Sequence, residues 1–103
     1  MEHVVVYITA PREHGERIAK YLVERKLAAC VNIAQVTSIY RWEGRVERDE
    51  EVLLVVKTRR DKLKELIAEV KSIHPYKVPE IIALPIVEGD LEYLRWIDES
   101  VNF

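Results

Sequence analysis

The sequence is poor in the residues that crosslink, loosen or interrupt a chain. Its 103 residues include three glycines, four prolines, one methionine and one cysteine. Because Cys30 has no second cysteine to pair with, no disulfide can form within the chain, and we expect a reducing compartment, the cytoplasm. Asparagine and glutamine are also scarce, while 33% of the residues are charged. This composition is typical of proteins from heat-adapted organisms.

Long apolar runs and a large excess of one charge are absent as well. No stretch reaches the roughly 18 apolar residues that a membrane-spanning helix needs, so we expect no membrane as a partner. The first residues, MEHVVVYIT, lack the basic start and long apolar segment of a secretory signal. The net charge is -2 with both signs interspersed, which argues against nucleic acid as a partner.

What the sequence does contain is a regular alternation of apolar patterns, which predicts a single domain over residues 1–103. The expected order is β-α-β-β-α-β-α, with strands at residues 4–8, 29–41, 46–58 and 81–87. Thr58 and Asp61 resemble a capping box for the second helix, and Asp90 is placed to cap the third. A change of alternation along the second strand predicts a bulge near Gln35.

This order of elements predicts an α+β ferredoxin-like sandwich, in which four antiparallel strands are arranged 4-1-3-2. Strands 1 and 3 are central in that arrangement, and they are the two strands with unbroken apolar runs, VVVYI and VLLVV. Strand 4 contains Pro85 and lies at an edge, where proline is tolerated. The residue pattern and the topology therefore agree.

Two features of the predicted fold indicate an assembly of several chains. The hairpin of strands 2 and 3 has arms of about 40 Å, whereas a globule of this length is roughly 30–35 Å across. We therefore expect the turn WEGR, residues 42–45, to project. The central strands are apolar on both faces, and two helices normally cover only one. The last helix can cover part of the second face, and we expect other subunits to cover the rest.

Five segments of the chain resemble the CutA family of divalent-cation tolerance proteins. They are LAACVNI, TSIYRWEG, VVKT, HPYKVPEIIALPI and GDLEYLRWI, and together they span nearly the whole sequence in the family's order. The resemblance implies a ferredoxin-like fold, a cytoplasmic homotrimer and an architecture similar to that of nitrogen-regulatory PII proteins. It also implies a role in tolerance of copper and other heavy metals.

The copper site proposed for some family members combines a cysteine late in the first strand with two adjacent histidines before the proline of HPY. The matching positions here are Ile8, Ile73 and His74, so one of the three donors is present. His74 remains a candidate metal ligand. The alternative is structural: His74 caps the carbonyls at the end of the second helix and packs against Tyr76.

The amino terminus is a second candidate metal site. Met1-Glu2-His3 places an imidazole third from a free amine. The amine, two backbone amides and the His3 ring can surround a square-planar Cu(II) or Ni(II) ion. The spacing suffices for this chemistry, although such a terminus also arises by chance. No cofactor is required by this interpretation, and copper is the candidate divalent metal.

The segment HPYKVPE, with its two prolines, is expected to hold Tyr76 and Glu80 near a subunit boundary. Lys57 lies on the same strand face as Leu53 and Val55, where a covered charge needs a partner, and Glu80 is the candidate. Lys57, Tyr76 and Glu80 are therefore predicted to bind a ligand. The alternative for Lys57 is a lysine at a strand end whose ammonium reaches water.

Two aromatic residues lie near the tip of the predicted hairpin. Tyr40 and Trp42 are predicted to anchor the interface between subunits, since aromatic side chains dominate contact energies. The alternative is a stacking site for a ligand. Cys30, in an apolar strand, is predicted to be a packing residue.

Signatures of the common catalytic classes are missing from the sequence. It contains no G-x-S-x-G, H-E-x-x-H, C-x-x-C or phosphate-binding loop. The sequence thus predicts a non-enzymatic homotrimer of divalent-cation tolerance that relays the binding of a ligand or metal, as PII proteins do. The competing hypothesis is an enzyme with a pocket between subunits that uses Lys57, His74 and Glu80.

Overall fold

A four-stranded antiparallel sheet organises the computed structural model, which describes residues 2–102. In chain order its elements are β1 (His3–Pro11), α1 (Arg12–Glu24), β2 (Cys30–Trp42), β3 (Arg45–Arg59), a 3₁₀ turn (Arg60–Lys62), α2 (Leu63–Ile73), β4 (Ile81–Pro85) and α3 (Leu91–Val101). The strands are arranged β2-β3-β1-β4. Counted from the other edge this is the predicted order, and it confirms the α+β ferredoxin-like fold.

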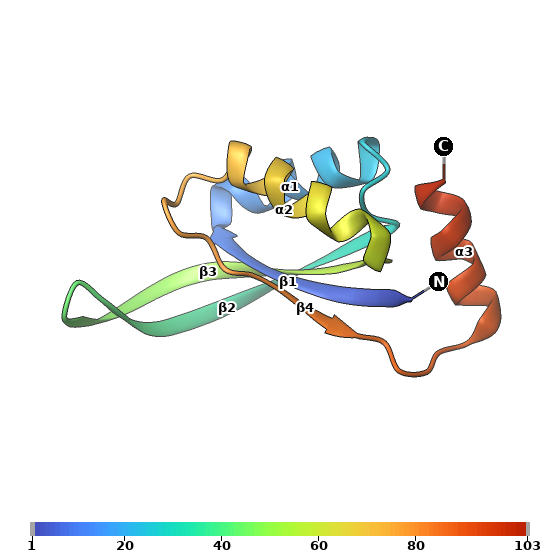
Figure 1. The fold of residues 1–103 in the computed structure, drawn as a ribbon. Coiled ribbons are helices and arrows are strands. Elements are labelled where there is room, and N and C mark those ends of the chain that lie inside the picture. The colour runs from blue at the N-terminus through green and yellow to red at the C-terminus, as the bar shows by residue number, and fades with distance from the viewer. Residues whose placement is uncertain (1, 103) are drawn as a thin grey trace.

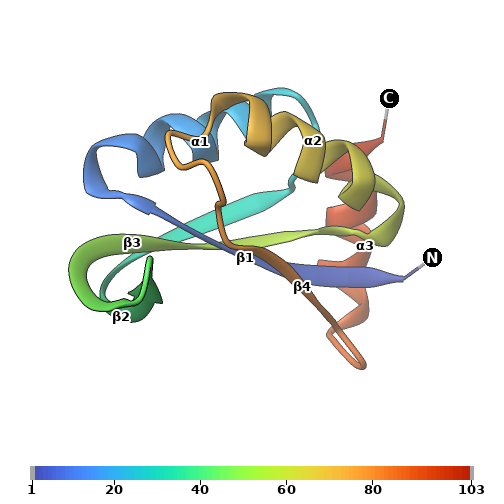
Figure 2. The ribbon, with the colours of Figure 1, turned by 60° about the vertical axis from the view of Figure 1, so that its left-hand side comes forward.

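Helices α1 and α2 cover one face of this sheet (Figures 1 and 2). Alternation along the central strands turns every second side chain toward these helices. The core between the two layers is aliphatic, and its members are at most 5% exposed: Val4, Val6, Ile8, Ala10, Ile18, Leu22, Leu27, Ala28, Val52, Leu54, Val56, Leu66 and Val70. Burying one large side chain of this kind contributes about 1.5–3 kcal/mol, so this layer is the main source of stability.

Helix α1 lies close against β3 because Gly15 has no side chain. A Cβ atom at Gly15 would be 2.5 Å from Cγ2 of Val52, which is far shorter than a van der Waals contact. The bare backbone of α1 therefore sits where a side chain would otherwise hold the helix away from the sheet.

The hairpin of β2 and β3 pairs without interruption along its whole length, so the predicted bulge near Gln35 is wrong. The alternation changes phase for another reason. Close to the body, β2 turns Val31 and Ile33 toward α1. Farther out α1 and α2 no longer cover the hairpin, and Tyr40 and Trp42 turn to the opposite face, where they line a cavity. The apolar residues of β2 therefore change from one face of the hairpin to the other, although its pairing with β3 is uninterrupted.

The starts of the last two helices differ from each other in how they are capped. Thr58 is fully buried in β3, and its hydroxyl donates a hydrogen bond of 2.7 Å to the carbonyl of Leu27. The predicted capping box is therefore wrong, and α2 begins at Leu63 after the 3₁₀ turn. Asp90 caps α3 as predicted, because its carboxylate accepts a bond of 3.0 Å from the backbone N–H of Tyr93.

The β2–β3 hairpin projects beyond the rest of the molecule, as the strand lengths predict (Figure 1). Its two strands have 13 and 15 residues, and the molecule measures 44 × 25 × 21 Å. The turn between them uses Glu43 and Gly44, whose φ angles of 50° and 80° are both left-handed. Two such residues in succession are typical of the tight turns that match the twist of paired strands.

Helix α3 lies at the end of the sheet away from the hairpin tip (Figure 1) and covers part of the second face. Its Ile97 and Val101 are fully buried and pack with Ala29. The remainder of that face is apolar and incompletely covered: Val5, Tyr7, Leu53 and Val55 are partly buried, while Ile82 and Leu84 are 51% and 42% exposed. Among residues 2–102 no helix is both long and apolar enough to span a membrane.

Candidate functional site

The connector, residues 74–80, runs from the end of α2 to the start of β4. His74 ends the helix with φ -79° and ψ 137°, the extended backbone that a residue before proline prefers. Since β4 pairs with β1 only as far as Ile8, the last residues of β1 are left for the connector to cover. The two prolines that flank Tyr76 and Lys77 therefore direct this segment across the edge of the sheet.

His74 fixes the connector to β1. Its ring is 8% exposed, and Nε2 lies 2.8 Å from the carbonyl oxygen of Thr9. Nδ1 accepts a bond of 3.0 Å from the backbone N–H of Tyr76. The two contacts together require the neutral tautomer with its proton on Nε2. The expected packing against Tyr76 is present, with ring centroids 4.9 Å apart.

Tyr76 reaches over the end of β1 to a carboxylate on β3. Its hydroxyl donates a hydrogen bond of 2.6 Å to Oε2 of Glu51, which is only 5% exposed. Burial, and then the hydrogen bond and charge of Glu51, raise the pKa of Tyr76 well above its ordinary value of 10.0. No lysine or arginine within residues 2–102 forms an ion pair with Glu51. The pair therefore consists of a neutral phenol and a carboxylate without a neighbouring cation.

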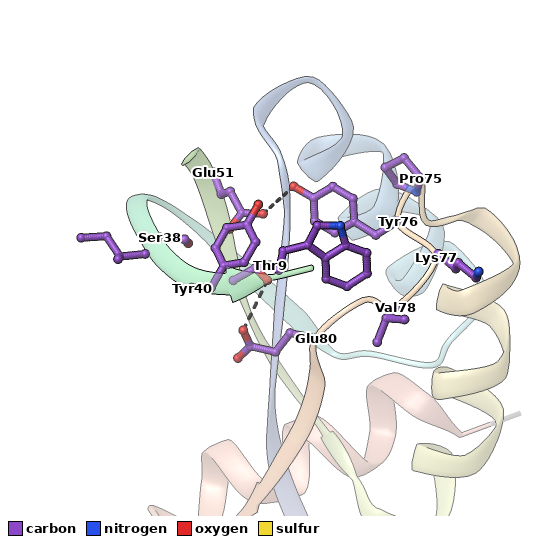
Figure 3. Close-up of a pocket in the computed structure, with 11 residues that line it drawn as sticks. Thr9, Ser38, Tyr40, Glu51, Pro75, Tyr76, Lys77, Val78 and Glu80 are labelled. Carbon is purple, nitrogen blue, oxygen red and sulfur yellow. Dashed lines mark hydrogen bonds between the residues drawn. The ribbon is translucent and has the colours of Figure 1, made fainter. Parts of the chain in front are cut away.

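These residues border a cavity of about 660 Å³ between the hairpin and the connector. Its lining comprises Thr9, Ser38, Ile39, Tyr40, Trp42, Glu51, Pro75, Tyr76, Lys77, Val78 and Glu80 (Figure 3). The hairpin and β1 form one side, and the connector forms the other. A cavity of this size lies within the range of about 300–1,000 Å³ that is usual for small-molecule sites.

The carboxylates around this cavity are held by hydroxyl groups. Tyr40 donates a hydrogen bond to Asp49, and this bond, aided by burial and the charge of Asp49, raises the pKa of Tyr40 to about 12. Thr9 donates a longer bond of 3.4 Å to Oε1 of Glu80. Figure 3 shows the Lys77 side chain directed away from Glu51. The interior of the cavity thus combines aromatic rings with negative charge.

The structure brings four of the predicted site residues together and separates the others. Tyr40, Trp42, Tyr76 and Glu80 all line the cavity, while His74 lies behind Tyr76. Lys57 is not among the lining residues.

Lys57 has a different environment from the one its sequence position suggests. Its ammonium donates to the side-chain oxygen of Asn32 and, at 3.1 Å, to the carbonyl of Val55. Lys57 lies opposite Val5 on β1, whereas Glu80 precedes the pair Ile81–Ile8. This offset along the strands places the predicted partner out of reach within one chain.

His3 lies at the far end of β1 from the cavity. Its Nε2 is 2.9 Å from Oδ1 of Asp98 on α3, and the same carboxylate oxygen lies 3.7 Å from Nη1 of Arg59. The contact joins the first strand to the last helix. The amino group of Met1, which the predicted terminal copper site needs, lies outside the described residues.

The described part of the chain does not fit a three-donor copper site. Residues 2–102 contain no group of three histidine, cysteine, aspartate or glutamate side chains that could hold a metal ion. Ile8 and Ile73 supply no donor atoms, and both ring nitrogens of His74 already have partners. A metal at His74 would have to displace the carbonyl of Thr9 or the amide of Tyr76.

Glu51 and Thr9 are two residues of the site that the sequence pattern did not identify. Glu51 lies in the charged run VERDEE, in which no spacing distinguishes it from its neighbours. Its burial depends on Tyr76, which is 25 positions away in the chain. The sequence offers one indirect indication. Side chains alternate between the two faces of β3, and this alternation, extended from Leu53, gives the face on which Glu51 lies.

The fold and this cavity define a ferredoxin-like protein with a projecting hairpin and a cavity between that hairpin and the connector. The family profile described as CutA1 divalent ion tolerance protein matches residues 4–100. The chain is 57% identical over 104 residues to the divalent-cation tolerance protein CutA of Thermus thermophilus, and the match covers 99% of this chain and 100% of the relative. The chain therefore belongs to the CutA family.

Relatives occur in distant organisms and share the same architecture. A CutA homologue of Xenopus laevis is 53% identical over 97 residues, which are 92% of this chain but 64% of that longer protein. The solved structure described as the periplasmic divalent cation tolerance protein CutA from Archaeoglobus fulgidus superposes with a TM-score of 0.95 at 51% identity. That superposition covers 97% of this chain and 99% of the other.

Proposed function

We propose that this chain acts in divalent-cation tolerance as a non-enzymatic, cytoplasmic homotrimer that responds to a bound ligand. Family membership supports the role in cation tolerance. The observation that carries the rest is the cavity in which Tyr40 and Trp42 of the hairpin face Tyr76 of the connector. A ligand bound there contacts the projecting element and the body of the fold together.

The trimer is proposed because one chain leaves its own apolar surface incompletely covered. The sheet face opposite α1 and α2 carries Ile82 and Leu84 in exposed positions. The outer edges of β2 and β4 pair with no other strand of the described chain. Strand edges that stay open promote aggregation, and a closed cyclic assembly hides them. Three sheets with their second faces turned inward would satisfy both requirements.

The relay is proposed from the position of the cavity. A ligand shifts a conformational equilibrium only by its difference in affinity for the two states. Here the hairpin wall and the connector wall are joined through the sheet and through the Tyr76–Glu51 hydrogen bond, so a change in hairpin position alters the cavity directly. In this proposal, ligand binding changes the position or the ordering of the projecting hairpin, and that change is the PII-like signal.

The role of metal is the least direct part of the proposal. A divalent ion, copper above all, is the expected physiological challenge, and His3 and His74 are the candidate ligands. Since His74 is bonded at both nitrogens, the proposal assigns the metal response to the assembled protein and not to a cage within one chain.

The competing enzyme hypothesis requires Lys57, His74 and Glu80 to meet. Within one chain Lys57 contacts Asn32, and His74 contacts Thr9. A shared active site would therefore need Lys57 of a neighbouring subunit.

The cytoplasmic location rests on the single cysteine, and the high content of charged residues supports the proposed heat adaptation.

The test of the proposed function combines growth with mass. A host that lacks its own family member would be grown in increasing copper with this chain, with an empty vector and with a Trp42→Ser variant. We expect the chain to restore growth and light scattering to give three times the 12.1 kDa chain mass. Unrestored growth by a correctly assembled protein contradicts the tolerance role, and a stable monomer contradicts the trimer.

A further inference from the structure

We propose that the cavity between the hairpin and the connector binds a small organic cation, whose ammonium group is held by Glu51 and by the rings of Tyr40, Trp42 and Tyr76. The inference deepens the proposed function, because it names the class of ligand for the same cavity. It does not depend on the trimer or on the role in metal tolerance.

Glu51 carries a charge that the rest of the chain compensates with one hydrogen bond. A buried carboxylate is costly unless a cation or several hydrogen bonds compensate it. Glu51 is 5% exposed and receives one hydrogen bond, from the hydroxyl of Tyr76. Its other oxygen, Oε1, accepts no hydrogen bond among residues 2–102, and since no buried side-chain oxygen of these residues lacks a partner, Oε1 is open to the cavity. A cationic ligand would supply the missing charge at the wall of the cavity.

Aromatic rings make up part of the cavity lining. Tyr40, Trp42 and Tyr76 come from two different segments and converge on one cavity. The face of an aromatic ring attracts a cation within about 6 Å of its centroid, and several rings around one centre select ammonium groups. Tyr76 also keeps its proton, since its pKa is raised, and it therefore presents a neutral ring.

The charge of the surroundings disfavours an anion in this cavity. Glu80 lies on the same cavity, and Asp49 is bonded to the hydroxyl of Tyr40. Lys77 is the one basic residue in the lining, and its side chain is directed away from Glu51 (Figure 3). A phosphate or carboxylate group beside Glu51 would face these acidic side chains, with the Lys77 ammonium directed elsewhere.

The size of the cavity limits the class of ligand further. A cavity of about 660 Å³ is larger than an ammonium group requires. The remaining lining includes Ile39, Pro75 and Val78, which are apolar. The ligand class that fits is a protonated or quaternary amine with a short tail of few polar atoms. The same cationic chemistry could also come from an arginine of a second copy, since Arg41 and Arg45 lie near the hairpin turn.

Calorimetric titration of the full-length protein with choline tests the charge requirement. The neutral isostere 3,3-dimethylbutan-1-ol, which replaces the quaternary nitrogen by carbon, is titrated in parallel at equal ionic strength. We expect one choline site per chain, with the isostere bound at least tenfold more weakly. Equal binding of the two probes, or no binding of choline, overturns the proposal.

Two variants locate the site. Glu51→Gln keeps an oxygen that can accept from Tyr76 but removes the charge, and we expect choline affinity to fall at least tenfold. Glu50→Gln is the matched control, because Glu50 is the next residue along β3 and bonds Arg12, Arg48 and Thr37 outside the cavity. Its choline affinity should be unchanged. Equal losses in both variants would contradict a site at Glu51.

The remaining outcomes separate this inference from the proposed function. If the hairpin of a second copy fills the cavity, the assembled protein binds no choline until Arg41→Ala or Arg45→Ala opens it, and the free-ligand proposal is overturned. Choline binding that depends on Glu51 in a protein without effect on copper tolerance supports the cation site and contradicts the proposed function. Copper tolerance conferred by an original chain that binds no choline supports the proposed function and contradicts the cation site.

Discussion

The phenol of Tyr76 donates a 2.6 Å hydrogen bond to the buried carboxylate of Glu51, and this contact joins the connector after α2 to the hairpin strand β3. The two residues come from segments that have no backbone pairing with each other. On the other side of the connector, His74 is bonded to β1 through Thr9. The connector is therefore held to both central strands by side chains, and the cavity wall depends on them.

Removing the Tyr76 hydroxyl should destabilise the protein. In Tyr76→Phe the carboxylate of Glu51 stays buried but loses its donor, and an unsatisfied buried group costs about 1–3 kcal/mol. A double-mutant cycle with Glu51→Ala, which removes the acceptor, followed by urea unfolding, measures the coupling. We expect the double variant to lose less stability than the sum of the two single variants. Additive losses would mean that the two groups do not interact.

Alkaline pH should lower the free energy of unfolding through the same tyrosine. The pKa of Tyr76 is raised in the folded protein, so the folded state keeps its proton at pH values where the unfolded chain has lost it. The stabilising contribution is complete below about pH 10, the unfolded pKa, and decreases as the pH rises toward the folded pKa. Urea unfolding across this range, with phenolate absorbance as a second signal, checks the sign. Tyr76→Phe should flatten the dependence, and an unchanged slope would assign it to other groups.

The sequence was informative about the fold because the central strands have two apolar faces and the helices have one. VVVYI and VLLVV identified β1 and β3 as inner strands, and Pro85 placed β4 at an edge. The errors arose where tertiary contacts replaced a local rule. Thr58 bonds the carbonyl of Leu27 and not its own helix. The phase change near Gln35 reflects a change of the covering layer and not an extra residue.

The site was predictable only in part, for a related reason. The prolines of the connector indicated Tyr76 and Glu80 because they break a helix at a fixed point. Lys57 was grouped with them from strand parity, which gives the face of a residue but not its position along the strand. Glu51 becomes distinctive only through its contact with Tyr76, and such a contact leaves no periodic signal in the chain.

Copper binding, if it uses the amino terminus, should depend on His3 and not on His74. Asp98 holds Nε2 of His3, which leaves Nδ1 free to join a terminal amine around Cu(II). We expect copper titration to give one site per chain that is lost in His3→Ala and after acetylation of the terminus. His74→Ala is the comparison variant and should retain the site. Loss of copper in His74→Ala alone would transfer the assignment to the connector.

Gly15→Ala should destabilise the protein although alanine favours helices. The helix gains up to about 1 kcal/mol in propensity, but the new Cβ would lie 2.5 Å from Cγ2 of Val52. Overpacking of a buried contact costs about 1–3 kcal/mol, and Val52 is too confined to move. Thermal unfolding should therefore show a lower midpoint. Val52→Ala removes the clash. Adding Gly15→Ala to the Val52→Ala protein should therefore lower the unfolding midpoint less than adding it to the original chain.

Trp42 should anchor the proposed trimer. It lines the cavity and still has 44% of its surface exposed, and it lies on a hairpin that extends past its own fold. A desolvated aromatic anchor contributes about 2 kcal/mol or more to an interface. We expect Trp42→Ser to shift the assembly toward monomer at micromolar concentration in sedimentation or light scattering, while Trp42→Phe, which keeps an aromatic ring, should remain largely assembled. If the serine variant assembles as tightly as the original chain, the anchor lies elsewhere. In that case the exposed Ile82 and Leu84 of β4 are the next residues to change, because they lie on the incompletely covered sheet face that the proposed trimer turns inward.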